Sequence, residues 1–320
     1  MLIDLAQVLA GLAVLLLAGD LLVNGAVNLA LRLGIPAMMV GMTVVAFGTS
    51  APELVVSVQA VWIGAGGLAL GNVVGSNIAN ILLVLGLPAL IAPLAVDREL
   101  RRDFAIMIAA TALFMALAAG GVFHIWQALV LLAALGLMLG DNLRRARVIR
   151  AGNHATEDPE NHLETADPSM PGWKLALYLA IGVIGLPIGA QLLVAGAVDI
   201  ASALGVSDAL IGLTLVAVGT SLPELATTAL AAWRREAGVA MGNIIGSNIF
   251  NLLCIIGVAG LVGPIPVPES MLRLDLWVMA ASSLLLLPFI LRGAPITRPA
   301  GLALSLAYAG YITFLVIRGG

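Results

Sequence analysis

The sequence predicts an all-α polytopic membrane protein with ten transmembrane helices, arranged as two inverted five-helix repeats. Three observations predict this class: the hydrophobic composition, ten apolar segments of helical length, and an internal duplication. Hydrophobic residues make up 61% of the 320 residues and charged residues only 10%, which excludes an ordinary soluble domain. An apolar run of about 20 residues is long enough to cross a bilayer as a helix.

Ten apolar segments of this kind follow one another along the chain. They cover residues 5–31, 36–63, 69–92, 103–120, 123–142, 173–198, 206–232, 239–262, 271–291 and 299–317. The only long polar segment lies between the fifth and the sixth, and its composition is typical of a linker. The chain therefore divides into a first repeat at 1–142, a linker at 143–172 and a second repeat at 173–320.

The basic residues predict the orientation. If both termini are outside, 13 of the 15 Lys and Arg residues fall on the inner side, and only Arg273 and Arg318 fall outside. The positive-inside rule then places the loop 143–172 in the cytoplasm. Short loops and the lack of a large regulatory domain indicate a prokaryotic plasma (inner) membrane. His154 and His162 lie in this loop beside acidic residues; an ion site is one interpretation and a solvated linker the favoured one, since nothing fixes a coordination geometry.

The two halves align at a single offset of 171 residues. LGIPAMMVGMTVVAFGTSAPEL at 33–54 falls on LGVSDALIGLTLVAVGTSLPEL at 204–225, and GNVVGSNIANILLVLG at 71–86 falls on GNIIGSNIFNLLCIIG at 242–257. Because each half has five spans, an odd number, the second half must cross the membrane in the opposite sense. Inverted repeats are typical of secondary transporters, which bind substrate near the midplane between the halves.

Two acidic residues lie in the middle of predicted spans. Glu53 and Glu224 occupy equivalent positions in the motifs GTSAPEL and GTSLPEL. A charged side chain at this depth costs on the order of 2.5–3.5 kcal/mol, so it indicates function. No Lys or Arg is expected at the same depth, and Asp20 is the only other candidate intramembrane acid. The glutamates must therefore be protonated, or a cation must come to them.

Further oxygen atoms accompany each glutamate and favour a cation. Thr49 and Ser50 lie on the same side of the helix as Glu53. Pro52 lacks an N–H, so the carbonyl of Gly48 loses its helical partner and can turn into a cavity. A helix that is merely kinked would explain the proline and the hydroxyls but not the glutamate. The second half repeats the pattern with Thr220, Ser221, Pro223 and Glu224.

The second motif supplies amide and hydroxyl oxygens. Asn72, Ser76 and Asn80 are spaced four residues apart on one face of a helix. Asn80 is interpreted as an ion ligand, whereas Asn77 could equally be a ligand or a contact between helices. The equivalent residues of the second half are Asn243, Ser247, Asn251 and Asn248.

These side chains are all hard oxygen donors. No His or Cys joins them, which argues against zinc, copper or iron, whereas Ca²⁺ accepts 6–8 oxygen ligands in a flexible shell. Two glutamates balance the charge of one Ca²⁺ or of two out of three Na⁺. Two carboxylates without a cation are unfavourable in a low-dielectric cavity, so the empty site does not change access from one side of the membrane to the other. A site that changes access only with Ca²⁺ or with Na⁺ bound exchanges one ion for the other.

The duplicated motifs resemble the α-repeats of the cation/calcium exchanger superfamily, in particular its sodium/calcium exchanger branch and the prokaryotic relatives of that branch. The resemblance covers nearly the whole chain and implies an antiporter that exchanges Na⁺ for Ca²⁺ by alternating access. It implies that helices 2, 3, 7 and 8 form the ion-binding core and that helices 1 and 6 slide across it. The sequence shows no nucleophile–base pair, cofactor fingerprint or basic groove with aromatic residues, which argues against an enzyme, a cofactor and a nucleic-acid partner. The expected partners are Ca²⁺, Na⁺ and the lipid bilayer, and the oligomeric state stays open, with a monomer plausible.

The resemblance also implies roles for individual residues. Glu53 and Glu224 would be the main Ca²⁺ ligands and would also bind Na⁺, with Asn80 and Asn251 at the centre. The flanking Na⁺ sites would be formed by Thr49, Ser50, Ser76, Thr220, Ser221 and Ser247.

One residue departs from the family pattern. The family often has Asp where this chain has Asn251, so the core carries two acids rather than three, and the ion stoichiometry, the potassium dependence and the selectivity stay open. The proton-coupled branch usually has a second carboxylate near the GN motif, which this chain lacks. A proton/calcium or broader cation exchanger is therefore the alternative. A membrane protein that binds Ca²⁺ without transporting it is a third hypothesis.

Overall fold

The computed structural model describes residues 2–97, 99–153, 167, 169–204 and 219–319. In these ranges the backbone is almost entirely helical, and the one sheet pairs β1 (Val122–Phe123) with β2 (Ile265–Pro266) in an antiparallel register. The helices of the first half are α1 (Leu2–Leu33), α2 (Ala37–Val40), the π-helical turn η1 (Gly41–Val45), α3 (Ala46–Thr49), α4 (Ala51–Trp62), α5 (Gly66–Ala79), the π-helical turn η2 (Asn80–Val84), α6 (Gly86–Ile91), α7 (Leu100–Ala118) and α8 (Ile125–Asn153). Those of the second half are α9 (Gly172–Ala203), α12 (Leu222–Trp233), α13 (Ala237–Ile249), the π-helical turn η4 (Phe250–Ile255), α14 (Ile256–Val262), the π-helical turn η5 (Met271–Asp275), α15 (Leu276–Leu284), α16 (Leu287–Arg292) and α17 (Arg298–Gly319).

Within the described ranges, these helices lie where the spans were predicted. In the described ranges, seven helices are long and apolar enough to cross a membrane, and the bent pair Ala37–Thr49 and Ala51–Trp62 makes an eighth. The fourth span is the 19-residue α7, which has charged residues in its first turn. The seventh predicted span, 206–232, is described only from residue 219 onward and ends as α12. The chain is an all-α membrane protein with ten helices in two inverted five-helix repeats.

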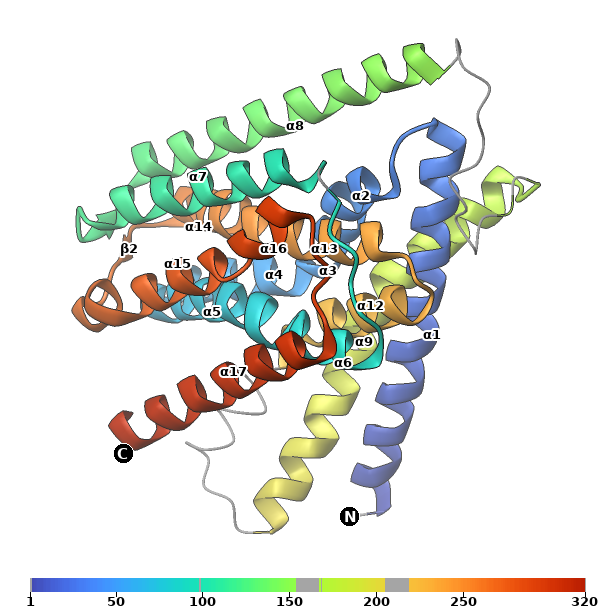
Figure 1. The fold of residues 1–320 in the computed structure, drawn as a ribbon. Coiled ribbons are helices and arrows are strands. Elements are labelled where there is room, and N and C mark those ends of the chain that lie inside the picture. Colours follow the sequence, from blue (N-terminus) through green and yellow to red (C-terminus); the bar gives the residue numbers. More distant parts are fainter. Residues whose placement is uncertain (1, 98, 154–166, 168, 205–218, 320) are drawn as a thin grey trace.

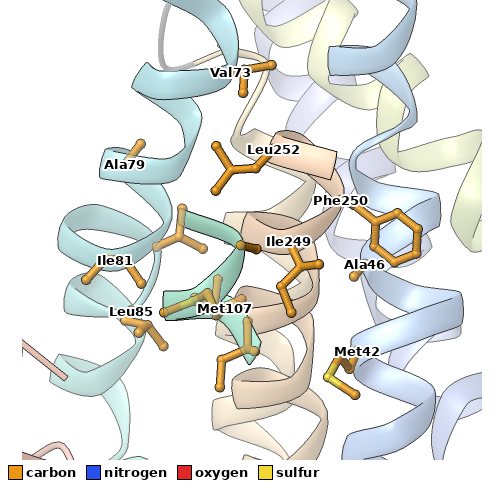
Figure 2. Close-up of a cluster of buried hydrophobic side chains, with 14 of the residues drawn as sticks. Met42, Ala46, Val73, Ala79, Ile81, Leu85, Met107, Ile249, Phe250 and Leu252 are labelled. Atoms are coloured by element: carbon orange, nitrogen blue, oxygen red, sulfur yellow. The ribbon is translucent and has the colours of Figure 1, made fainter. Parts of the chain in front are cut away.

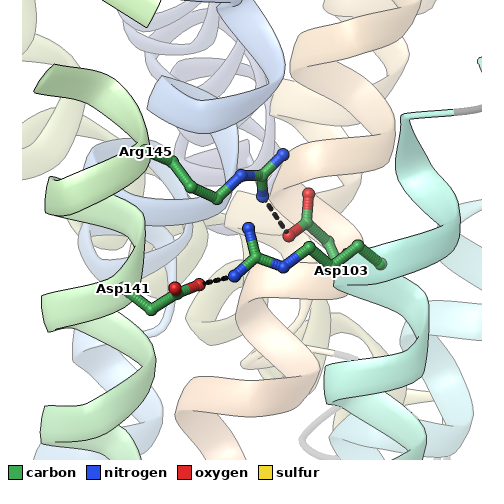
Figure 3. A network of polar contacts seen from close by, with 4 residues as sticks. Asp103, Asp141 and Arg145 are labelled. Atoms are coloured by element: carbon green, nitrogen blue, oxygen red, sulfur yellow. Dashed lines mark hydrogen bonds and ion pairs between the residues drawn. The ribbon is translucent and has the colours of Figure 1, made fainter. Parts of the chain in front are cut away.

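One boundary differs clearly from the prediction. The fifth span was expected to end at 142, but α8 continues to Asn153. Its charged turn packs on α7, where Arg145 forms an ion pair with Asp103 at 3.0 Å and Arg102 pairs with Asp141 (Figure 3). The basic start of the predicted linker is therefore helical, because these ion pairs hold the end of α8 against α7. His154 and His162 lie outside the described residues.

Two long helices, α1 and α9, cross each other on one side of the molecule (Figure 1). Their contact depends on glycine. A Cβ atom added to Gly182 would lie 2.6 Å from the Cβ of Leu22, and one added to Gly189 would lie 2.8 Å from the backbone nitrogen of Leu15. Small residues let membrane helices approach to backbone contact in this way.

The two helices that carry the GN motifs form the centre of the molecule. In the apolar 18-residue stretches of Gly66–Ile91 and Ala237–Val262, 72% and 83% of the residues are buried. In the other complete spans the buried share is at most 33%. Apolar side chains from several helices, among them Met42, Ile81 and Met107, pack around Ile249 and Leu252 (Figure 2). This packing brings the second span, in the first repeat, against the eighth span, in the second repeat. The two repeats that the sequence offset defines are therefore in direct contact.

Candidate functional site

Both GTS-PEL motifs break a helix at the same residue. Ser50 (φ −83°, ψ 4°) and Ser221 (φ −87°, ψ 3°) each precede a new helix, α4 and α12 respectively. Pro52 and Pro223 stand in the first turn of these helices, where a missing N–H has no helical partner to lose. The first-half span bends by 45° at the break. The predicted broken helix is confirmed, and it places a glutamate at the start of each new helix.

The two glutamates are buried between the repeats. Glu53 is 0% and Glu224 1% exposed, and Ser50 Oγ of the first repeat donates a hydrogen bond to Glu224 Oε1 of the second at 3.1 Å. In the described part of the chain, both oxygens of Glu53 and Oε2 of Glu224 have no hydrogen-bond partner, and no Lys or Arg forms an ion pair with either carboxylate. A buried carboxylate without compensation is strongly unfavourable, so these oxygens call for a cation or a proton.

Two asparagines present their carbonyl oxygens to the same core. Asn80 Nδ2 donates to Asn248 Oδ1 at 3.2 Å, and Asn251 Nδ2 donates to Asn77 Oδ1 at 3.0 Å, two bonds related by the sequence offset. Their own Oδ1 atoms are buried and have no hydrogen-bond partner among the described residues. Asn80 and Asn251 therefore have free ligand oxygens, whereas Asn77 and Asn248 use their side-chain oxygens to accept the hydrogen bonds that hold the two central asparagines. This arrangement favours the bridging role for Asn77 and Asn248.

Both central asparagines lie in π-helical turns. η2 begins at Asn80, and η4 includes Asn251 at the equivalent position. Such turns are rare and are frequent at functional sites, because they interrupt the regular pairing of a helix backbone. The apolar pattern around these residues shows an uninterrupted helix, so the sequence carries no signal of the turns.

The first asparagine of each GN motif connects the two repeats. Asn243 Oδ1 accepts a hydrogen bond from Thr49 of the other repeat at 3.2 Å, and Asn243 Nδ2 donates to Thr228 of its own repeat at 3.2 Å. The equivalent contacts in the first half join Asn72 to Thr220 at 3.5 Å and to Ser57 at 3.0 Å.

Ser57 and Thr228 were missed by the sequence reasoning. Both are completely buried, and each lies four residues after a glutamate. A search for hydroxyls that recur at the same offset would have found them. They place each GN asparagine, and through it the threonine of the opposite repeat.

The remaining predicted ligands lie in the same core. Thr49 Oγ1 is 3.5 Å from Ser247 Oγ, and the side-chain oxygen of Ser221 is buried with no hydrogen-bond partner among the described residues. Ser76 is also buried, whereas Thr220 is partly exposed. The structure thus gathers predicted residues from the second, third, seventh and eighth spans in one buried core with the two glutamates.

Asp20 does not belong to this core. It forms an ion pair with Arg234 at the end of α12, with Arg234 Nε 2.7 Å from Asp20 Oδ1. Asp20 thus has a basic partner, whereas the expectation that Glu53 and Glu224 have none holds among the described residues.

The donor set is made of carboxylate, amide and hydroxyl oxygens. The described residues contain no group of three or more His, Cys, Asp or Glu side chains that could hold a metal ion. The single cysteine, Cys254, is buried in η4. Hard oxygen donors at the interface of two inverted repeats define a secondary transporter of hard cations.

Comparison with known proteins gives the family. The family model described as "Sodium/calcium exchanger protein" matches residues 3–140 and 174–317. The protein named CaxA from Alkalimonas amylolytica is 40% identical over 97% of this chain and 98% of its own length. The sodium/calcium exchanger MaX1 from Methanosarcina acetivorans is 33% identical over 96% of this chain and 97% of its own length. A structure of the sodium-calcium exchanger NCX_Mj soaked with Na⁺ and Sr²⁺ matches with a TM-score of 0.80 at 33% identity, covering 97% of both chains. The chain belongs to the sodium/calcium exchanger family.

Membership of this family settles the class of activity. The family consists of transporters, so the chain is a transporter and not an enzyme. Na⁺ and Ca²⁺ are the substrates of the family and not cofactors. The chain is an integral multi-pass membrane protein.

Proposed function

We propose that this chain exchanges Na⁺ for Ca²⁺ by alternating access, with the ions bound near the bilayer midplane between the repeats. One observation carries the proposal. Six buried oxygen atoms of the core have no hydrogen-bond partner among the described residues: Glu53 Oε1 and Oε2, Asn80 Oδ1, Ser221 Oγ, Glu224 Oε2 and Asn251 Oδ1. The offset relates the two glutamates to each other and the two asparagines to each other. Their number and chemistry fit the oxygen shell of Ca²⁺.

The ligand roles follow from charge and position. Glu53 and Glu224 are the main Ca²⁺ ligands, because together they balance two positive charges. Asn80 and Asn251 complete the centre with neutral oxygens, which add ligands without adding charge. The flanking Na⁺ sites use six hydroxyl groups, four beside the helix breaks and two within α5 and α13: Thr49, Ser50, Thr220, Ser221, Ser76 and Ser247.

Coupling follows from the cost of an empty core. With neither ion bound, two carboxylates would cross the low-dielectric centre of the membrane without compensation. The core therefore changes access only with Ca²⁺ or with Na⁺ bound. The long helices α1 and α9, which pack on each other through glycine, are the elements that slide across the core.

The proposal includes the placement of the chain in the membrane. The first repeat is 1–142, the cytoplasmic linker is 143–172 and the second repeat is 173–320, with both termini outside. The membrane is the plasma membrane of a prokaryote, in keeping with the similarity to the inner membrane protein YrbG of Escherichia coli, which is 35% identical over 92% of this chain. The positive-inside distribution of Lys and Arg supports this orientation.

The decisive experiment is ⁴⁵Ca²⁺ uptake into sealed proteoliposomes preloaded with Na⁺, with K⁺ or choline inside as controls and equal pH on both sides. Uptake that requires internal Na⁺ supports the proposal. Uptake that ignores Na⁺ but follows an imposed pH gradient favours the proton-coupled alternative. Binding of Ca²⁺ without any flux would leave the third hypothesis, a protein that binds the ion and does not transport it.

A further inference from the structure

A cavity of about 540 Å³ opens at a place that the transport site does not use. Its walls are the segment that follows α6, the end of α12 with the turn into α13, and the first residue of α17. Figure 1 shows the beginning of α17 next to α6. Two arginines, Arg235 and Arg298, line the cavity together with Trp233. They belong to the residues that the charge pattern places on the cytoplasmic side.

The equivalent place in the other half is filled. By the offset of 171, Gly66 corresponds to Ala237, and Pro266 to Ala95, both of which line the cavity. A Cβ atom on Gly66 would lie 2.9 Å from Pro266 Cδ, so the first-half turn is packed against β2. The duplicated fold therefore closes this junction on one side of the membrane and leaves it open on the other.

The two arginines are also specific to the open side. Arg235 corresponds to Gly64 and Arg298 to Gln127. Gly64 has φ +79°, a left-handed conformation that glycine adopts freely, whereas Arg235 has φ +59° at the same position and is the one non-glycine residue with positive φ in the described ranges. A side chain that is kept in a strained backbone position points to a function of that side chain.

The geometry of the rim suits an anion. Arg298 Nε donates to the carbonyl of Leu90 at 3.1 Å and Arg298 Nη2 to that of Ile91 at 3.2 Å, which fixes its guanidinium at the mouth of the cavity. Arginine carries five donors in a planar fork, so the guanidinium retains capacity for a phosphate. The acidic Glu236 is buried and is not among the described lining residues.

The surroundings favour a lipid over a soluble anion. Trp233 is 75% exposed beside the cavity, as expected for an aromatic residue at a membrane interface. From Arg298, the exposed Leu302 (49%) and Leu306 (62%) follow at helical spacing along α17 and offer an apolar track for an acyl chain. Basic pockets between membrane helices are typical binding places for anionic headgroups.

We propose that this cavity binds the phosphate-bearing headgroup of an anionic phospholipid between Arg235 and Arg298. The headgroup lies against the end of α12, the helix that begins next to Glu224. The lipid thereby holds the end of α12 and the segment that follows α6 in place relative to each other. This inference depends on the fold and not on which ions are exchanged.

The test is native mass spectrometry of the detergent-solubilised full chain, titrated with dioleoylphosphatidylglycerol. Dioleoylphosphatidylcholine, with identical acyl chains and no net charge, is the matched lipid. We expect one tightly bound phosphatidylglycerol per chain, and about thirtyfold weaker binding in the double variant R235Q/R298Q, since each arginine near a headgroup contributes about fivefold. The control variant R292Q removes an exposed arginine that does not line the cavity and should bind the lipid as the wild type does.

A second variant protects the test from a folding defect, because Arg298 also caps the carbonyls at the end of α6. Ala95→Trp fills the cavity and keeps both arginines, and it should weaken phosphatidylglycerol binding as well. Equal affinity for the two lipids, equal loss in R292Q, or unchanged binding in Ala95→Trp would overturn the proposal. So would complete displacement of the lipid by inorganic phosphate, which would identify the cavity as a site for the soluble anion.

Discussion

Glu53 and Glu224 each supply half of the negative charge that the core can set against a divalent ion. Replacing either one by Gln keeps the shape of the side chain and removes that half. We expect Glu53→Gln or Glu224→Gln to lower Ca²⁺ affinity by at least about a hundredfold, because leaving a buried charge without its partner costs about 3–5 kcal/mol. The measurement is Na⁺-dependent ⁴⁵Ca²⁺ uptake as a function of Ca²⁺ concentration.

The matched control is Glu269→Gln, which removes a carboxylate that is exposed and paired with Arg273 in the same helical turn. Surface pairs of this kind contribute little, so uptake should stay at the wild-type level. Wild-type exchange in either core variant would show that Ca²⁺ binds elsewhere.

Asn251 is the position at which the resemblance leads us to expect an acid, and its hydrogen bond predicts what an acid there would do. Its Nδ2 donates to Asn77 Oδ1, and only a protonated Asp could make the same donation. In Asn251→Asp, only the protonated carboxyl could still donate, and the complete burial of this position favours the uncharged form. We expect near wild-type exchange at neutral pH and a progressive loss of exchange, relative to the wild type, as the pH is raised.

Exchange measured in parallel for both proteins over a series of pH values tests this expectation. A variant whose rate ratio to the wild type does not change with pH would contradict the assigned donor role. Asn251→Ala serves as the comparison, because it removes the donor at every pH.

The sequence predicted the principal oxygens of the core but not how they are held. Glu53 and Glu224 could be found because charge inside an apolar span is rare and because both recur at one offset. The tie from Asn243 to Thr49 joins residues of different repeats, and no pattern within one helix reports it. The pair of Asp20 with Arg234 likewise joins residues 214 positions apart, so the sequence gives no sign of it.

At the scale of helices, the crossing of α1 and α9 depends on residues without side chains. Gly189 lies at this contact, where a Cβ would be 3.0 Å from the carbonyl oxygen of Gly11. We expect Gly189→Val to force the helices apart and to lower stability by about 1–3 kcal/mol, as overpacking does in a tight core. Thermal unfolding of the purified protein, followed by exchange in proteoliposomes, measures both consequences.

Gly136→Val in α8 is the control for helix propensity, since a Cβ at Gly136 meets nothing within 4 Å and the residue is exposed. Both substitutions put a β-branched residue in the middle of a helix, but only one disturbs a contact between helices. Equal thermal shifts in the two variants would mean that the glycines of α9 serve the helix itself and not its crossing with α1.

The ends of helices could be predicted where the local sequence sets them, but not where contacts with another helix set them. Pro52 and Pro223 predict the helix breaks at Ser50 and Ser221, because proline is typical of the first turn of a new helix. The extension of α8 to Asn153 depends on Arg145 reaching Asp103 in a neighbouring helix, which composition does not reveal.

At the scale of the whole molecule, the charge of the core in each loaded state decides whether transport responds to membrane potential. Two carboxylates with one Ca²⁺ give a neutral core. If the hydroxyls beside the two helix breaks hold one Na⁺ on each side of the glutamates and a third Na⁺ occupies the central position, the core carries one positive charge. Exchange would then move one net charge in each cycle.

This net charge predicts the sign of the voltage effect. When Na⁺-loaded vesicles take up Ca²⁺, three positive charges leave and two enter, so a potential that is positive inside should accelerate uptake and one that is negative inside should slow it. One elementary charge across the membrane corresponds to about 2.3 kcal/mol per 100 mV, a large effect on the exchange equilibrium. Potentials set by K⁺ gradients with valinomycin test the prediction. Uptake that is equal at both potentials would mean that two Na⁺ replace one Ca²⁺, and that a core with Asn251 in place of an acid stays neutral in both of its loaded states.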